Sequence, residues 1–225
     1  MMDSRPVSQA IENYLKAIYL LEQRERKVTT KALADSLDVA APSVTAMIKR
    51  LHAMRLVRYT RYRGMALTPT GKRMALEVIR HHRLLELYLV EALGLPWDQV
   101  HEEAERLEHV ISEELEERIA EHLGHPGTDP HGDPIPTKEG QVEQPPYLPL
   151  SELNPGTAAI IKRVGDQDPD KLRYLATLGL FPQVRVMLVE KAPFGGPMCL
   201  EVGASRCTLG EELARQIYVL PVKAL

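Results

Sequence analysis

The sequence predicts a mainly α-helical chain that ends in a small β-rich domain. Along most of the segment 8–123, apolar residues recur every three or four positions, the spacing of amphipathic helices. Eight of the 17 prolines then fall between residues 124 and 155, a density typical of a linker. After residue 156 come short apolar runs typical of strands. These observations favour helical domains first, then a linker, and a small β domain last.

Three helices are expected near the N-terminus. The first covers residues 8–23, whose apolar positions share one face. A short helix over 30–37 follows, with Thr30 as its expected N-cap. The third covers 42–54 and has Pro42 at its first position, where a helix does not need the missing amide proton.

A hairpin and two longer helices come next. Residues 57–68 are predicted to form two short strands around a turn at Arg63 and Gly64. A long helix then begins in 68–71 and runs to Leu93, and Gly94-Leu95-Pro96 separates it from a helix over 97–123. In the last part, strands are expected at 157–164, 184–190, 197–203 and 216–222, with a short helix at 168–179. The predicted domains are 1–71, 72–140 and 156–225, with a linker at 141–155.

The composition argues against secreted and membrane proteins. The chain has 225 residues, of which 44% are hydrophobic, and no apolar run reaches the roughly 18 residues of a membrane span. The N-terminal residues lack the apolar core of a signal peptide. Two cysteines, Cys199 and Cys207, are too few for a disulfide framework or a four-thiolate zinc site. We therefore expect a reduced, cytoplasmic protein with no membrane contact.

The net charge of −3 conceals a strong division along the chain. Residues 1–80 contain 15 Lys/Arg and 7 Asp/Glu, whereas residues 81–125 contain 3 and 12. A basic first third suggests a polyanionic partner. The acidic middle also holds six of the eight histidines, which fits either a metal site or a solvated helix face.

The basic third has the pattern of a winged helix-turn-helix. A short helix, a turn at Asp38-Val39 and a second helix place Val44, Met47, Ile48, Leu51 and Met54 on one expected core face. Hydroxyls and cations are left outward, and the hairpin tip is basic, as expected of a wing that touches phosphates or the minor groove. Many small helical domains place polar residues this way without binding DNA. The candidate DNA-binding residues are Thr30, Pro42, Ser43, Thr45, Lys49, Arg50, Arg61, Tyr62 and Arg63.

The acidic middle contains candidate ligands at helical spacing. His82 and Glu86 are one helical turn apart. Four more candidates share an arc of about 100° on the next helix, at 100° per residue; these are His101, Glu105, Glu108 and His109. Imidazole and carboxylate ligands favour Mn(II) or Fe(II). Many other glutamates lie on this helix, so the arc also has a chance explanation. The histidines without such spacing are expected at the surface: His52, His81, His122, His125 and His131.

Several motifs along nearly the whole chain resemble the diphtheria-toxin-repressor family of metal-dependent repressors, which has iron-dependent and manganese-dependent branches. In sequence order the motifs are Glu12-Asn13-Tyr14-Leu15, Ala41-Pro42-Ser43-Val44-Thr45, Leu67-Thr68-Pro69-Thr70-Gly71, His82-Arg83-Leu84-Leu85-Glu86, Val100-His101-Glu102-Glu103-Ala104-Glu105, Leu107-Glu108-His109, His131-Gly132-Asp133-Pro134-Ile135-Pro136 and Asp168-Pro169-Asp170-Lys171-Leu172-Arg173-Tyr174-Leu175. The resemblance implies a helical dimerisation and metal-binding domain. It also implies a C-terminal β-barrel of the Src-homology-three type, also called FeoA-like.

The resemblance also implies roles for particular residues. Glu105, Glu108 and His109 correspond to the regulatory metal site, and His82, Glu86 and His101 to a neighbouring second site. Asp168 falls near a further ligand of that second site, and the first helix offers Asn13, or alternatively Glu12. The carboxylate at Glu105 resembles the manganese branch, where the iron branch has cysteine. The manganese branch, however, has aspartate at the position of Asn13 and glutamate at the position of Lys16, so this chain combines features of both branches.

Together these features predict a homodimeric repressor of metal-uptake genes. Mn(II) or Fe(II), at two sites per subunit, would fix the spacing of the recognition helices for a palindromic double-stranded operator. Two alternatives remain at this stage. One is a winged-helix regulator that needs no metal, and the other is a metal-dependent hydrolase. The chain has no nucleophile elbow, His-Glu-x-x-His pattern or phosphate loop, so we do not expect an enzyme.

Overall fold

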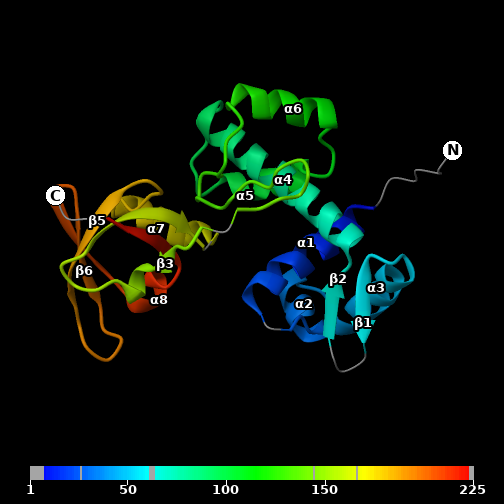
Figure 1. The fold of residues 1–225 in the computed structure, drawn as a ribbon, viewed down its shortest axis with the longest axis horizontal. Helices are drawn as coiled ribbons and strands as arrows, with labels where there is room; N and C mark the ends of the chain where they lie inside the picture. The colour runs from blue at the N-terminus through cyan, green and yellow to red at the C-terminus, as the bar shows by residue number, and fades with distance from the viewer. Residues whose placement is uncertain (1–7, 26, 61–63, 144, 166, 223–225) are drawn as a thin grey trace. The chain divides into compact units, whose positions relative to one another are not determined.

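The structure is a computed structural model that describes residues 8–25, 27–60, 64–143, 145–165 and 167–222 (Figure 1). No helix in these ranges has both the length and the apolar character needed to cross a bilayer. The chain forms two compact units, and each is described by itself. The first comprises Met1–His82, Leu107–Ile111 and Pro136–Gln141, and the second comprises Arg83–Arg106, Ser112–Ile135 and Val142–Leu225.

The first unit begins with the three predicted helices, α1 (Gln9–Arg24), α2 (Thr30–Leu37) and α3 (Ala41–Ala53). The N-cap of α2 is Thr29, whose side chain accepts a hydrogen bond from the amide of Ala32 at 3.0 Å. Thr30 is already the first helical residue, so the prediction of Thr30 as the cap was wrong by one position. Asp38 ends α2 in the left-handed conformation.

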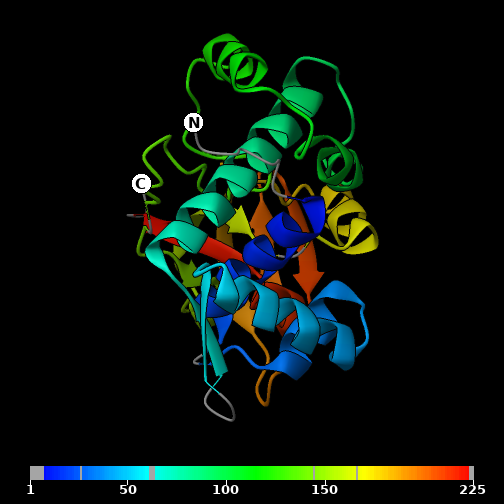
Figure 2. The ribbon, with the colours of Figure 1, turned by 90° about the vertical axis from the view of Figure 1, so that its right-hand side faces the viewer.

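The helix α3 turns an apolar face inward and is followed by the predicted hairpin. Val44, Ile48 and Leu51 are fully buried, whereas Met54 is 44% exposed. The buried face of α3 therefore ends at Leu51, about one turn before the predicted end at Met54. Strands β1 (Val57–Thr60) and β2 (Gly64–Leu67) pair antiparallel. In both ribbon views this hairpin lies beside α3 and groups with α1 and α2 (Figures 1 and 2).

The long helix α4 (Pro69–Glu91) starts close to Leu56, which lies between α3 and β1. Thr68 Oγ1 accepts a hydrogen bond from the amide of Gly71 at 3.1 Å. A Cβ on Gly71 would meet the Leu56 carbonyl oxygen at 2.1 Å, so only glycine allows this approach. The start of α4 is therefore fixed against the segment that leads into the hairpin.

The helix predicted over 97–123 is two helices, α5 (Val100–Leu107) and α6 (Glu113–His122). Ser112 has extended backbone angles and accepts a hydrogen bond from the amide of Leu115 at 3.2 Å, so it starts a new helix. The prediction of one continuous helix was wrong because this cap competes with helix continuation. The short segment between the two helices carries Glu108 and His109.

The second unit contains an antiparallel sheet with strand order β3-β8-β4-β5-β6-β7. The predicted strands β4, β5, β6 and β8 are confirmed, as is the helix α7 (Pro169–Thr177). The order leaves β3 and β7 as edges, so among the described residues the sheet is open and the expected closed barrel was wrong. The strands are β3 (Leu148–Pro149), β4 (Ala158–Val164), β5 (Arg185–Lys191), β6 (Met198–Val202), β7 (Ser205–Leu209) and β8 (Ile217–Val222), and the short helices are η1 (Leu150–Glu152) and α8 (Glu211–Ala214).

One apolar core lies under this sheet. Leu172 and Leu175 of α7 pack into it, together with Trp97 from the segment before α5. Phe181 covers the Trp97 ring at a centroid distance of 4.9 Å. Because Trp97 shares this core, the chain just before α5 is held by the sheet domain.

Candidate metal centre

A buried carboxylate lies at the centre of a polar cluster in the first unit. Glu108 is 1% exposed, and its Oε2 is 2.6 Å from Nδ1 of His82, a residue of α4. Its Oε1 is 3.3 Å from Nε2 of His109. Two imidazoles therefore flank one carboxylate, which is the type of donor set that holds a divalent transition metal.

A lysine from α1 faces the same carboxylate. Lys16 Nζ donates to both oxygens of Glu108, at 3.0 and 2.7 Å, and lies 3.2 Å from His82 Nδ1. Lys16 is 8% exposed, so this ion pair is buried. The sequence identified Lys16 only as a departure from the manganese branch, and its contact with a residue 92 positions away carried no sequence signal.

The helix α1 reaches the same segment a second time. Glu12 Oε2 accepts a hydrogen bond from His109 Nδ1 at 2.6 Å. Asn13 follows Glu12, and its Oδ1 is a buried oxygen with no hydrogen-bond partner among the described residues. An oxygen left without a donor in the interior is unfavourable unless it binds water or an ion. Glu12, the alternative ligand, thus contacts His109, while Asn13 supplies an unused oxygen donor.

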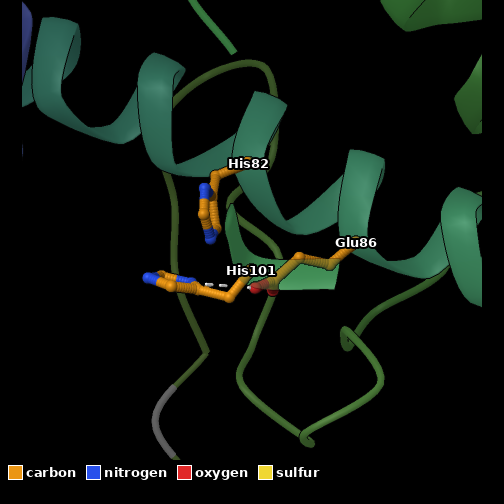
Figure 3. A group of neighbouring side chains, drawn as sticks. All are labelled: His82, Glu86 and His101. Carbon is orange, nitrogen blue, oxygen red and sulfur yellow. Dashed lines mark hydrogen bonds and ion pairs between the residues drawn. The ribbon is translucent and has the colours of Figure 1, made fainter. Parts of the chain in front are cut away.

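A second polar cluster belongs to the second unit and centres on Glu86, which is fully buried. Figure 3 shows Glu86 projecting from α4 one turn after His82, as the four-residue spacing predicts, with the ring of His101 beside its carboxylate. His101 Nδ1 donates to Glu86 Oε1 at 3.2 Å. His101 Nε2 lies 3.9 Å from Glu105 on α5, where both side chains are partly exposed.

The other side of Glu86 faces His131, which the sequence predicts at the surface. That prediction was wrong: His131 is fully buried, and its Nδ1 lies 3.7 Å from Glu86 Oε2. Its Nε2 donates to the carbonyl of Trp97 at 2.9 Å, and the two rings stack at 5.4 Å. Four-residue spacing could not reveal this histidine because it lies on a loop 45 positions from Glu86.

Asp129 completes this cluster and organises the loop that carries His131. Its Oδ1 accepts the amides of His131 and Asp133 at 2.8 and 2.9 Å, and Oδ2 lies 3.7 Å from Arg83 Nε. Ligand atoms of Glu86, Asp129 and His131 lie within 4.8 Å of one another, and all three residues are buried. The three residues therefore form a compact nitrogen and oxygen donor set.

Burial and charge shift two pKa values in this cluster. Burial, with the nearby charges of Asp133 and Glu86, raises the pKa of Asp129 to about 7. Burial lowers the pKa of His131, but the Glu86 and Asp129 carboxylates outweigh it and raise the value to about 9. The cluster thus favours a positive charge at its centre.

The remaining candidates have mixed outcomes. His81, also expected at the surface, is buried and its Nδ1 contacts the carbonyl of Glu108 at 3.1 Å. His52, His122 and His125 are exposed, as predicted. Asp168 is exposed and caps α7, where its Oδ1 accepts the amides of Asp170 and Lys171. Within the described ranges, Asp168 joins none of the groups suited to a metal ion.

The candidate DNA-binding residues of α3 are mostly on its outer face. Pro42, Ser43, Lys49 and Arg50 are exposed. Thr45 is half-buried, and its hydroxyl donates to the carbonyl of Ala41 at 3.0 Å. The three wing candidates, Arg61, Tyr62 and Arg63, lie outside the described residues.

Three family models match consecutive parts of the chain. The iron dependent repressor N-terminal DNA binding domain matches residues 7–65, and the iron dependent repressor metal binding and dimerisation domain matches residues 68–137. The FeoA domain matches residues 148–221.

Similar proteins share nearly the whole length. The iron-dependent repressor IdeR of Mycobacterium tuberculosis is 34% identical over 220 residues, 92% of this chain and 95% of that protein. The diphtheria toxin repressor of Corynebacterium glutamicum is 38% identical over 222 residues, 94% of this chain and 96% of that protein. A solved manganese-dependent transcriptional repressor in complex with manganese has a TM-score of 0.87 at 38% identity, covering 94% and 100% of the two chains.

The fold, the two clusters of metal-donor side chains and the similarity to known repressors define a metal-dependent transcriptional repressor rather than an enzyme. The chain belongs to the iron-dependent repressor family.

Proposed function

We propose that this protein is a homodimeric repressor of metal-uptake genes that binds its operator when Mn(II) or Fe(II) occupies the clusters described above. The observation that carries the proposal is the meeting of α1 with the Glu108–His109 segment. The helix α1 packs in the part of the chain that matches a DNA-binding model, whereas Glu108 and His109 lie in the part that matches a metal-binding model. A metal ion at Glu108 and His109 is therefore placed to act on α1.

We assign the ligands of the first site to Glu105, Glu108 and His109, with the oxygen of Asn13 or Glu12 from α1. The unused Asn13 oxygen supports this assignment, since a metal ion would satisfy it. A bound ion would tie α1 to this segment and narrow the positions open to the DNA-binding helices. Because metal then favours the DNA-competent state, DNA in turn tightens metal binding.

We assign a second site to His82, Glu86 and His101, with Asp168 as the further ligand that the resemblance implies. The buried neighbours Asp129 and His131 supply additional donors at Glu86. Two nitrogen and oxygen sites per subunit suit Mn(II) or Fe(II), and affinity alone favours later transition metals, so metal availability in the cell would decide which ion acts.

For DNA we assign a winged helix-turn-helix within residues 1–71, with α3 as the recognition helix. Ser43 and Thr45 lie near the start of α3, where a recognition helix contacts base edges. Lys49 and Arg50 are exposed further along α3 and suit phosphates. The wing would add Arg61, Tyr62 and Arg63. Thr30, at the start of α2, and the exposed Pro42, in the first turn of α3, would add further contacts. Two such modules in a dimer predict a palindromic operator in the cytoplasm.

The dimer is proposed for residues 72–140, with 141–155 as the linker and 156–225 as the sheet domain. Each unit leaves large apolar side chains exposed: Val110 in the first is 66% exposed, and Leu93 and Leu115 in the second are 58% and 51% exposed. A contact between two copies of the chain would cover such side chains.

The test is fluorescence-anisotropy binding to promoter DNA of a metal transporter and to the upstream region of the protein's own gene. Binding is measured at fixed salt in chelator, in Mn(II), and in anaerobic Fe(II). We expect at least about tenfold tighter binding with metal, the usual range of coupling between sites. Equal binding in chelator and in metal would favour the alternative, a winged-helix regulator that needs no metal.

A further inference from the structure

We propose that Lys16 is the resident cation of the Glu108 centre, and that a metal ion binds there only by displacing its ammonium group. The proposal deepens the function proposed above and rests on Glu108 as a ligand. It assigns to Lys16 the role of setting the metal concentration at which the repressor responds.

The first step of the argument is that the Lys16 ammonium engages both oxygens of Glu108. The distances are 3.0 Å to Oε1 and 2.7 Å to Oε2, and the carboxylate is 1% exposed. His82 and His109 occupy further positions around the same oxygens, at 2.6 and 3.3 Å. The carboxylate is thus enclosed by three nitrogen-bearing side chains from three parts of the chain.

The second step is that a metal ion and this ammonium group compete for the same place. Bonds between a transition metal such as zinc and a carboxylate oxygen are about 2.0–2.2 Å long. An ion bound to either oxygen of Glu108 would then lie close to an ammonium group that is itself within 3.0 Å of both oxygens. Two cations at such a separation repel each other strongly away from bulk water. The Lys16 side chain has a flexible four-carbon stem, so its head can move away without moving α1.

The third step is what the lysine does before metal arrives. An unpaired carboxylate at this depth would be strongly unfavourable, and Lys16 neutralises it. The lysine comes from α1, so without metal its flexible side chain links α1 to Glu108. A bound metal ion would instead link α1 to this segment through Asn13 or Glu12. Metal binding is therefore an exchange of one cation for another, and its apparent affinity is reduced by the stability of the ion pair that it replaces.

The experiment compares the full-length protein with Lys16→Met and Lys16→Gln. Mn(II) binding is measured by competition with a fluorescent chelating dye, and thermal unfolding is measured in chelator and in Mn(II). Methionine keeps the length of the side chain without the charge, and glutamine keeps a hydrogen-bond donor if the methionine variant does not fold. Lys31→Met, at an exposed lysine of α2, is the matched control.

We expect both Lys16 variants to bind Mn(II) at least about tenfold more tightly than the wild type, because removing one partner of a buried ion pair leaves the other charge uncompensated. Their unfolding temperature should be lower in chelator and should rise more on adding Mn(II), while Lys31→Met should match the wild type. Unchanged or weaker Mn(II) binding by folded variants would overturn the role of Lys16 and leave the proposed function standing. A wild-type protein that binds no metal would overturn both.

Discussion

The two polar clusters balance their buried carboxylates in different ways. In the first unit, Glu108 is paired with the ammonium group of Lys16. In the second, Glu86 and Asp129 face His131, and Arg83 lies 3.7 Å from Asp129. The first cluster therefore takes its charge from a lysine that a metal ion can replace, whereas the second takes it from a histidine whose charge depends on pH. Two clusters with similar ligands can thus respond to different signals.

The first cluster should lose the most stability when Glu108 is replaced. Replacing Glu108 by alanine leaves the Lys16 ammonium group buried without its carboxylate, so we expect a loss of about 3–5 kcal/mol in the free energy of unfolding. Urea denaturation in chelator measures the loss. Glu102→Ala, at an exposed glutamate of α5, should change stability by no more than about 0.5 kcal/mol. Equal effects of the two changes would show that the Lys16–Glu108 pair contributes nothing.

The second cluster should differ from the first in the pH dependence of unfolding. The pKa of His131 in the folded protein, about 9, is above its ordinary value, so its contribution is complete below about pH 6.5 and is lost as pH rises through 9. The raised pKa of Asp129, about 7, acts at lower pH, and its loss is complete near pH 7. Between pH 7.5 and 9.5 we therefore expect stability to fall by about 1–3 kcal/mol because of His131.

This prediction is checked by unfolding in chelator at a series of pH values. His131→Gln should flatten the decline above pH 7.5. His122→Gln, which changes an exposed histidine, should leave it as in the wild type. A decline of the same size in His131→Gln would assign it to other groups.

The smallest effect separates general stability from the chemistry of the clusters. Thr29→Ala removes the N-cap of α2 and should lower the free energy of unfolding by about 1 kcal/mol. The affinity for Mn(II) in the dye competition should not change, because Thr29 belongs to neither cluster. Thr30→Ala, one position along, should have the smaller effect on stability. The opposite order would favour Thr30 as the N-cap.

Local patterns in the sequence predicted most elements and part of the site. Apolar spacing identified α1 to α4, and four-residue spacing placed His82 and Glu86 on successive turns of one helix. The cap at Ser112, which splits the helix expected over 97–123, went unnoticed because the apolar and acidic pattern continues across it. The spacing of apolar residues does not reveal a helix break that a single capping side chain such as Ser112 produces.

The missed site residues were those defined by distant contacts. Lys16 meets Glu108 across 92 positions, and His131 meets Glu86 from an irregular loop. The sequence could mark Lys16 only as a change of charge relative to similar proteins. Such contacts depend on how the elements pack, and packing is not encoded in the spacing of residues along one helix.

The loop that carries His131 is fastened to the sheet, and this limits how the chain can be shortened. The amide of Val164 in β4 donates to the carbonyl of His131 at 2.8 Å. Gly132 fits so closely that a Cβ there would lie 1.9 Å from the carbonyl oxygen of Lys162. A shorter form of the chain that ended before β4 would still contain Lys16 and Glu108. The loop that carries His131 would lose its contacts with Val164 and Lys162. Loss of the sheet domain in evolution would therefore weaken the cluster around Glu86 and His131 more than the Lys16–Glu108 pair.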